Sequence, residues 1–471
     1  MIQRHGGQRS LFEAALGSME EFLDAPLKRL DALLDDETLV TTVFQRQAQR
    51  WPQSRGHGRR GTPADVALRL LVLQRVRGWT FDETEREVRA SLVYRWVTHI
   101  YLGRVPDAKT VLRLSHVIGD EGVRALHARV AEVGMAQLRV QGRRARVDTT
   151  VVETNIHYPT DSTLLLDGIR VLTRAAQRIA AVTGQVALRI RNRLRAANRR
   201  VREIGRASRS RAPAGRQRLQ QGYRRLVALT RATIRDARRV LQTLNERLQP
   251  TASVAVRRAV RRARDVVQTF VPRMEQVVTQ TRARVFGGDT HYPEKLLSLF
   301  EPHTEAIRKG KAAKPTEFGH LVKIQEAERG LVVTYEVYEH RPADSALLLP
   351  TIECHQKAFH RAPRLLAADA GFWSRTNRQR AEDSGVKQVC VPATGRPSAT
   401  QRERQHQRWF RRGQRWRTGS EGRVSVLKRR DGLDRCRYRG FSGIQRWTGW
   451  GVLAHNVHLL INRTARPSPA R

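Results

Sequence analysis

The sequence predicts an α/β protein in which all-helical regions precede and interrupt the segments that form a sheet. Three observations predict this class. Apolar residues recur at helical spacing through residues 1–140, and a β-branched pattern of period two occupies 144–153. After residue 286, short apolar runs alternate with helical patterns. An Arg-rich helical region, residues 164–285, separates the first strand pattern from the others.

The charge balance favours a polyanionic partner. The chain has 471 residues, enough for two or three domains, and a formal net charge of +44. Its pI is about 11.6. Arginine dominates over lysine, which suits bidentate contacts with phosphates. An anionic membrane is the alternative partner, but no stretch approaches 18 uninterrupted apolar residues, so we expect no transmembrane helix.

The N-terminal segment and the cysteines favour a cytoplasmic protein. The start of the chain has no long apolar run followed by a cleavage site, so we do not expect secretion. Cys354, Cys390 and Cys436 are far apart and odd in number. They indicate neither a zinc site nor a disulfide framework, and they fit a reducing compartment.

Residues 1–140 are predicted to form a helical domain. Thr80 with Glu83 has the spacing of a capping box, and Gly78 and residues 105–107 indicate breaks between helices. Short helices with tight breaks are typical of a helix-turn-helix DNA reader, so we expect this domain to contact DNA. The alternative is a helical domain that packs against the rest of the chain or dimerises.

Residues 144–163 are predicted to supply the first core strand and a polar connection. The strand covers 144–153 and holds one bare carboxylate, Asp148. An aspartate inside a strand is disfavoured and costly to bury unless a cation meets it. The preceding basic residues, or a metal ion, are the available partners.

Residues 164–285 are predicted to form three long amphipathic helices with outer faces rich in arginine. The breaks fall at 205–215 and at Pro250, and Pro272 is expected to kink the third helix. Runs of like charge repel, so we favour contact with a phosphate backbone. Solvated helix faces, and dimerisation through the apolar stripes, are the alternatives.

Residues 286–463 are predicted to contain the remaining sheet. The expected elements are strands at 318–324, 330–335, 364–369 and 386–391, and helices at 343–359, 372–383 and 417–430. The basic segment 392–416 carries Trp409, Phe410 and Trp416, which either stack on an unpaired base or pack in a core. Residues 464–471 are expected to form a loose tail.

Without the helical insertion, this order of elements is that of a ribonuclease-H-like fold. Asp148 lies in the first strand, Asp369 ends a later strand, and Glu421 lies in the helix at 417–430. Carboxylates at neighbouring strand ends and on a facing helix can converge from distant sequence positions. Hard cations such as Mg²⁺ prefer carboxylate oxygens, and a pair of them suits phosphoryl transfer.

The C-terminal helix also carries a resemblance to a known family. Arg417, Glu421 and Lys428 reproduce the R-(3)-E-(6)-K part of the signature of bacterial insertion-sequence transposases of the DDE class. The tyrosine expected three residues before the arginine is Gln414 in this chain, which puts the role of that tyrosine in doubt.

Other segments extend the resemblance over most of the chain. Residues 147–153 and 365–372 are similar to the first and second aspartate motifs of the family, and residues 107–110 to its preceding helical domain. The sequence of residues 149–161 and the Arg-rich insertion make the chain most similar to the group called ISNCY.

The resemblance implies a catalytic triad of Asp148, Asp369 and Glu421, which would bind two Mg²⁺ or Mn²⁺ ions. Arg417 and Lys428 would hold DNA phosphates. The implied activity is cleavage at transposon ends followed by transfer of the 3′-hydroxyl into target DNA. Terminal inverted repeats and target DNA are the implied double-stranded partners, bound by a homodimer or higher multimer in the bacterial nucleoid, without a membrane.

Other interpretations stay open at this point. A catalytically inactive or repurposed DNA-binding regulator, and a ribonuclease-H-like nuclease without joining activity, are the alternative functions. Asp369 has the alternative role of a helix N-cap, and Glu421 that of an ion-pair partner of Arg417 or Lys428. The alternatives for the first acid are Glu153, Asp161 and Asp167, and we expect Asp344 to be a helix cap.

Overall fold

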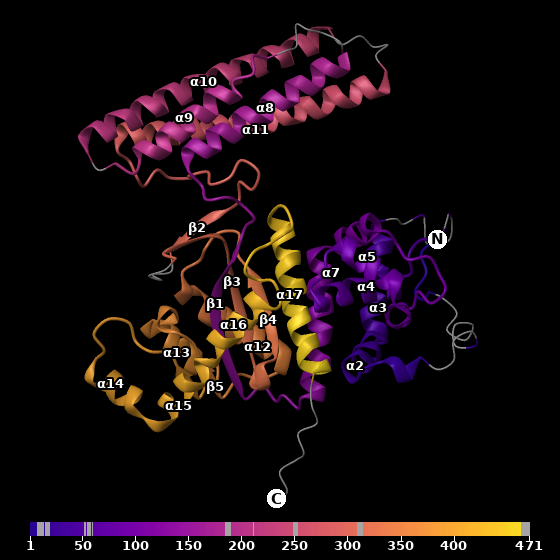
Figure 1. The fold of residues 1–471 in the computed structure, drawn as a ribbon. Helices are drawn as coiled ribbons and strands as arrows, with labels where there is room; N and C mark the ends of the chain where they lie inside the picture. The colour runs from indigo at the N-terminus through magenta and orange to yellow at the C-terminus, as the bar shows by residue number, and fades with distance from the viewer. Residues whose placement is uncertain are drawn as a thin grey trace, which may run out of the picture. The chain divides into compact units, whose positions relative to one another are not determined.

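The computed structural model describes residues 1–6, 14, 19–50, 53, 58, 60–183, 190–210, 212–247, 253–308 and 314–462. Within these residues the protein is a mixed α/β molecule, mostly helical, with one mixed sheet (Figure 1). It divides into two compact units. We call Met1–Asn155 with Ile307–Arg471 the core unit, and Ile156–Ala306 the helical unit. The expected tail at 464–471 lies outside the described residues.

The N-terminal part of the core unit is all-helical where it is described. Thr80 and Glu83 form the expected capping box, with Thr80 Oγ1 accepting from the Glu83 N–H and Glu83 from the Thr80 N–H. Gly78 ends a helix with a φ of 71°, a conformation that favours glycine. The helices are η1 (Glu20–Phe22), α2 (Ala25–Leu34), α3 (Glu37–Arg50), α4 (Ala64–Arg77), α5 (Phe81–Ala90), α6 (Leu92–Val97) and α7 (Ala108–Gln137).

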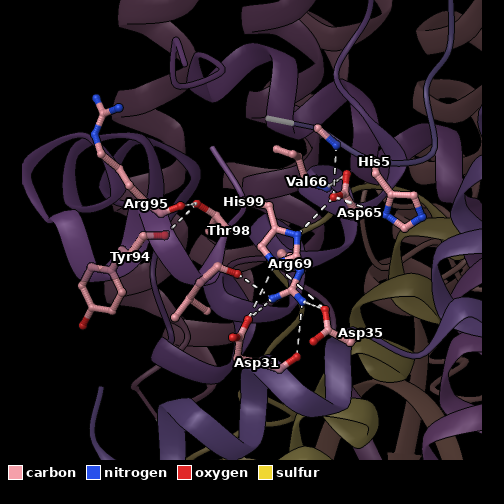
Figure 2. Close-up of polar contacts among 12 residues, drawn as sticks. His5, Asp31, Asp35, Asp65, Val66, Arg69, Tyr94, Arg95, Thr98 and His99 are labelled. Carbon is pink, nitrogen blue, oxygen red and sulfur yellow. Dashed lines mark hydrogen bonds and ion pairs between the residues drawn. The ribbon is translucent and has the colours of Figure 1, made fainter. Parts of the chain in front are cut away.

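A buried ion network joins these helices (Figure 2). Arg69 of α4 is fully buried, and its guanidinium binds Asp31 at 2.5 Å and Asp35 at 2.6 Å. His99 lies beside it, with Nδ1 3.2 Å from Asp65. A buried guanidinium needs such partners because an unpaired buried charge is strongly destabilising.

The sheet has the strand order β2-β3-β1-β5-β6, with β4 paired to β3. The antiparallel pairing of β1 with β3 places Asp148 opposite Ile324. β5 runs parallel to β1 and pairs with its first residues, so the two strands point in the same direction. The strands are β1 (Arg144–Glu153), β2 (Glu305–Arg308), β3 (Thr316–Glu326), β4 (Val332–Val337), β5 (Leu365–Ala367) and β6 (Gln388–Cys390).

Helices cover both faces of this sheet. Val147 and Val151 of β1 pack in one cluster with α12 (Leu348–Phe359) and α13 (Arg375–Asp383). Val152 of β1 packs in another with α16 (Gly419–Arg429) and α17 (Phe441–Ile461). Alternate residues of β1 therefore face opposite helix layers, as its period of two predicted.

α17 was not predicted, and it joins the sheet to the N-terminal helices. Ile444 and Trp447 pack against the sheet, while Leu453, Val457 and Leu460 pack in the cluster of α2, α4 and α7. The helix is buried on nearly all sides. A helix buried all round lacks the one-sided pattern that marks an amphipathic helix.

Several short helices add detail to the predicted elements. Residues 343–359 contain a short 3-10 helix, η5 (Asp344–Leu347), before α12, and residues 370–383 contain η6 (Ala370–Phe372) before α13. The basic segment 392–416 is helical, with α14 (Ala399–His406) and α15 (Arg408–Arg417). No described helix is long and apolar enough to cross a membrane.

The helical unit contains four described helices, so the expectation of three is wrong. They are α8 (Asp161–Thr183), α9 (Leu194–Ala207), α10 (Pro213–Arg247) and α11 (Val254–Gly287). The apolar stripe that looked continuous through residue 204 belongs to two helices. Pro272 lies within α11, whereas the break expected at Pro250 falls outside the described residues.

The apolar stripes of the four helices face one another in a bundle (Figure 1). Ile169 of α8, Ile204 of α9, Leu226 of α10 and Met274 of α11 share one buried cluster. The stripes are therefore used within the chain, which removes the support for dimerisation through them. The outer faces carry the arginines.

Candidate active site

The first predicted acid, Asp148, is held near the middle of β1 on the face covered by α16. Its Oδ1 accepts a hydrogen bond from the Thr149 N–H at 2.8 Å, and its Oδ2 accepts one from the Ser420 hydroxyl at 2.9 Å. Ser420 is at the start of α16, directly before Glu421. The contact therefore brings the helix that carries the third predicted acid to the first.

The second predicted acid, Asp369, follows β5, the parallel neighbour of β1. Its side chain caps η6 by accepting the Gly371 N–H at 3.0 Å, so the capping role is present. Burial raises the pKa of the Asp369 carboxyl, and the negative charges of Asp148 and Asp344 raise it further. The fold thus brings Asp148 and Asp369 within electrostatic reach across two adjacent strands.

Asp344, which the sequence predicts to be a helix cap, lies close to Asp369. The expected cap is wrong, because the N-cap position of η5 is Ala343 and makes no side-chain hydrogen bond. Its carboxylate borders Gly371 together with that of Asp369: a side-chain carbon at Gly371 would lie 3.2 Å from each. Its Oδ1 is buried without a hydrogen-bond partner among the described residues. The sequence indicated a cap only because this aspartate follows Pro342 closely.

Glu421 follows Ser420, the residue that contacts Asp148, but its own side chain contacts an arginine. Its Oε1 lies 3.0 Å from Arg417, and 65% of its side chain is exposed. The positive charge of Arg417 partly opposes the rise in the pKa of Asp369, so this guanidinium lies near both Glu421 and Asp369. The ion-pair role considered for Glu421 is therefore present, and its contact with the two aspartates stays a prediction.

Lys428, predicted to contact DNA, is tied to the sheet. Its ammonium lies 3.3 Å from Glu317 of β3, a residue that is 4% exposed. A lysine paired with a buried carboxylate stabilises the packing of α16 on the sheet. Its predicted contact with phosphate stays a prediction.

A second buried network fixes α16 against β1. Arg146, 6% exposed, binds Glu326 of β3 at 2.7 Å and donates to the Trp416 carbonyl oxygen at 2.6 Å. Arg423 of α16 binds the same Glu326 oxygen at 3.2 Å. The Arg146–Glu326 pair therefore connects two strands, the end of α15 and α16, at a point two residues along β1 from Asp148.

Gln414, at the position where the family signature has tyrosine, anchors α15 to the sheet. Its side-chain amide donates to the Cys390 carbonyl oxygen at 2.8 Å and to the Ala368 carbonyl oxygen at 3.4 Å. These carbonyls lie at the ends of β6 and β5, beside Asp369. The residue helps to form the site even though it cannot supply a phenol.

The rival acids have other partners. Glu153, at the end of β1, forms ion pairs with Lys314 and, at 3.5 Å, with Arg435. Asp161 and Asp167 belong to the helical unit, where each lies 2.6 Å from an arginine of that unit. These pairings account for the burial of the three carboxylates.

The aspartates have the chemistry of a divalent-cation site. The negative charges of Asp148 and Asp344 raise the pKa of Asp369, and a bound cation would relieve this repulsion. The Asp344 carboxylate borders the same place through Oδ2, and its Oδ1 is buried without a hydrogen-bond partner among the described residues. Within the described part of the chain, no three histidine, cysteine or acidic side chains are grouped closely enough to hold a metal ion. The donor set fits Mg²⁺ or Mn²⁺ in chemical type, with Glu421 outside the group as placed.

Two family models match separate parts of the chain. Residues 15–116 match the model described as Transposase domain (DUF772). Residues 377–461 match the model described as Transposase DDE domain, and this range includes Glu421 but neither aspartate. No curated protein and no solved structure matches the chain. The two matches, at opposite ends of the sequence, support an insertion-sequence transposase.

Proposed function

We propose that this protein is a DDE transposase with a ribonuclease-H-like catalytic core, a DNA-binding N-terminal helical domain and an Arg-rich helical insertion. Asp148, Asp369 and Glu421 are its catalytic acids. It cleaves a strand at each end of its element and transfers the 3′-hydroxyl into target DNA. The observation that carries this proposal is the approach of Asp148 and Asp369 from adjacent parallel strands, with α16 fastened to Asp148 through Ser420.

A different group orients each of the three catalytic acids. Asp148 is oriented by Ser420 and the strand backbone, and Asp369 by the Gly371 N–H. Glu421 reaches the pair after Arg417 exchanges it for a DNA phosphate. Such an exchange is electrostatically balanced because the phosphate replaces the carboxylate as the anion beside the guanidinium.

The three acids would hold two Mg²⁺ or Mn²⁺ ions. Bound there, the ions supply positive charge for the transferring phosphoryl group and activate the attacking oxygen. The chain's own contribution is to bring the carboxylates together and to orient them. Asp344 is available to the same cation because its Oδ1 has no partner among the described residues.

The implied partner is double-stranded DNA at the terminal inverted repeats and at the target. The helical unit supports this, since residues 161–287 contain thirty arginines, no lysine and seven acids. Arg195, Arg199, Arg202 and Arg206 are exposed and repeat once per turn of α9. Like charges at this spacing destabilise a helix unless an anion lies against it, and a phosphate backbone supplies one. Pairing of two ends would require a dimer or higher multimer. The Arg-rich insertion and the sequence of residues 149–161 support an assignment of the protein to the ISNCY group.

The test is strand cleavage at a labelled duplex that carries the element's own terminal repeat. We expect the purified protein to nick this duplex with Mn²⁺ and to join its end to a second DNA. Asp148→Asn should abolish both reactions and leave duplex binding intact. Glu153→Gln is the matched control, because this acid at the C-terminal end of the same strand is paired with cations.

The outcomes separate the functions considered. Salt-sensitive duplex binding without nicking in either protein would identify a DNA-binding regulator of the same ancestry. Nicking without joining would identify a nuclease. Loss of nicking in Glu153→Gln but not in Asp148→Asn would move the first catalytic acid to the end of β1.

A further inference from the structure

A basic and aromatic cavity lies at the start of β1 and β5, away from the carboxylates. It has a volume of about 740 Å³, in the range of pockets that hold one small ligand. Among the described residues that line it, five are arginines, two are tryptophans and none is acidic. The arginines are Arg143, Arg144, Arg364, Arg408 and Arg412.

One face of α15 forms the wall of this cavity. Trp409, Arg412, Gly413 and Trp416 are three, four and seven residues apart, so they form a single stripe along the helix. Both tryptophans are only partly buried, packed beside a small cluster that includes Leu365. Phe410, by contrast, is 4% exposed and belongs to that cluster, so its role is core packing.

The close approach of α15 to the sheet creates the site. A side-chain carbon at Gly413 would lie 2.5 Å from Cys390 Sγ and 3.4 Å from Leu365 Cδ1. Only a residue without a side chain lets the helix rest on β5 and β6. This contact places α15 beside β5 (Figure 1), and the tryptophans of the helix line the cavity together with arginines at the start of the strands.

We propose that this cavity binds an unpaired nucleotide of a DNA strand, with its base against Trp409 and Trp416 and its phosphates on the arginines. Aromatic rings bind a base only when its face is free, which excludes the stacked interior of a duplex. Guanidinium groups suit phosphate oxygens, and the lack of lining acids leaves their charge for a polyanion.

The distance to the candidate active site fits a continuous strand. Four residues of β1 separate Arg144 from Asp148, or roughly 13 Å of extended chain. The parallel β5 has the same separation between Leu365 and Asp369. A strand of a duplex advances about 3.4 Å per nucleotide, so the cavity would receive a base about four nucleotides from the cleaved bond. This assignment of distance rests on the proposed function, whereas the binding site itself does not.

The test measures binding of the full chain to a fluorescent thymidine oligomer of about eight nucleotides, the length of a short single-strand site. A blunt duplex is the second probe. Trp409→Leu should weaken binding of the oligomer roughly 5- to 150-fold, the value of one base stacked on an aromatic ring, and should leave duplex binding unchanged. Retained duplex binding also shows that the variant is folded.

Two arginine variants test whether the cavity itself binds the phosphates. Arg412→Gln should weaken binding of the oligomer and lower the slope of log K against log salt by about 0.7. Arg411→Gln is the matched control, because this exposed arginine lies on the same helix but does not line the cavity. Equal effects of the two arginine variants would indicate diffuse attraction and overturn the proposal.

Four further results test the proposal. Unchanged binding of the oligomer by Trp409→Leu overturns the proposal, and so does displacement of the oligomer by inorganic tripolyphosphate with equal strength in wild type and Trp409→Leu. Trp409-dependent binding in a protein that cannot nick DNA supports the cavity and refutes the proposed function. Nicking that does not depend on Trp409, without single-strand binding, supports the function and refutes the cavity.

Discussion

Replacing Arg146 by methionine should show how far the candidate site depends on a buried ion network. The guanidinium connects Glu326 of β3 with the Trp416 carbonyl oxygen, at 2.7 Å and 2.6 Å. Methionine fills a similar space but donates no hydrogen bond. The substitution therefore leaves a buried carboxylate with one cation fewer and a backbone carbonyl without its donor.

The expected cost follows from the burial of the partners. Arg146 and Glu326 are 6% and 2% exposed, and breaking a buried ion pair from one side costs about 3–5 kcal/mol. Arg423, whose side chain is 20% exposed, still binds the same Glu326 oxygen at 3.2 Å. One remaining cation reduces the penalty, so we expect the lower end of the range, about 3 kcal/mol.

Equilibrium unfolding in urea, followed by tryptophan emission, measures this cost. All eight tryptophans of the chain belong to the core unit, so the signal reports on that unit alone. Arg144→Met is the control, because this exposed residue lies on the same strand. We expect it to change the free energy of unfolding by less than about 0.5 kcal/mol.

The double variant Arg146→Met with Glu326→Gln provides the refutation. If the cost of the single variant comes from an unpaired buried charge, removing that charge should restore much of the stability. Additive losses in the double variant would show that packing, rather than ion pairing, holds α16 against β1. An unchanged midpoint in Arg146→Met would refute the reasoning outright.

Three further predictions follow from the site. Asp369→Asn should stabilise the protein at pH 7 and not below pH 4. The native state holds the proton of Asp369 more tightly than the unfolded state, so ionisation of this carboxyl lowers stability as pH rises above the unfolded pKa of about 3.9. Urea unfolding at both pH values measures the effect. Stabilisation by the variant at the lower pH would contradict this reasoning. Gly413→Val should lower the free energy of unfolding by about 1–3 kcal/mol by pushing α15 off the sheet, and it should speed thiol modification of buried Cys390. Unchanged thiol reactivity in the variant would count against the close contact. Arg199→Gln with Arg202→Gln should lower the salt slope of duplex binding by about 1.8, measured by anisotropy, if α9 contacts phosphates; an unchanged slope would remove that face from the interface.

The sequence by itself determined the features that depend on nearby residues. The alternation in residues 144–153 placed Asp148 on one face of β1, and the spacing of Thr80 and Glu83 located the start of a helix. The motif around Glu421 predicted its helix, α16. Hydrogen bonds and periodic packing within a few residues decide such features, so the local sequence contains the information.

Only the tertiary structure decided which distant residues meet. α17 has no one-sided pattern because it is buried between the sheet and the N-terminal helices, so its role could not be read from periodicity. The approach of Asp344 to Asp369, and the pairing of Glu421 with Arg417, depend on strand pairing and side-chain packing across the fold. Spacing in a sequence does not fix these distances, because the chain between two such residues can close in many ways.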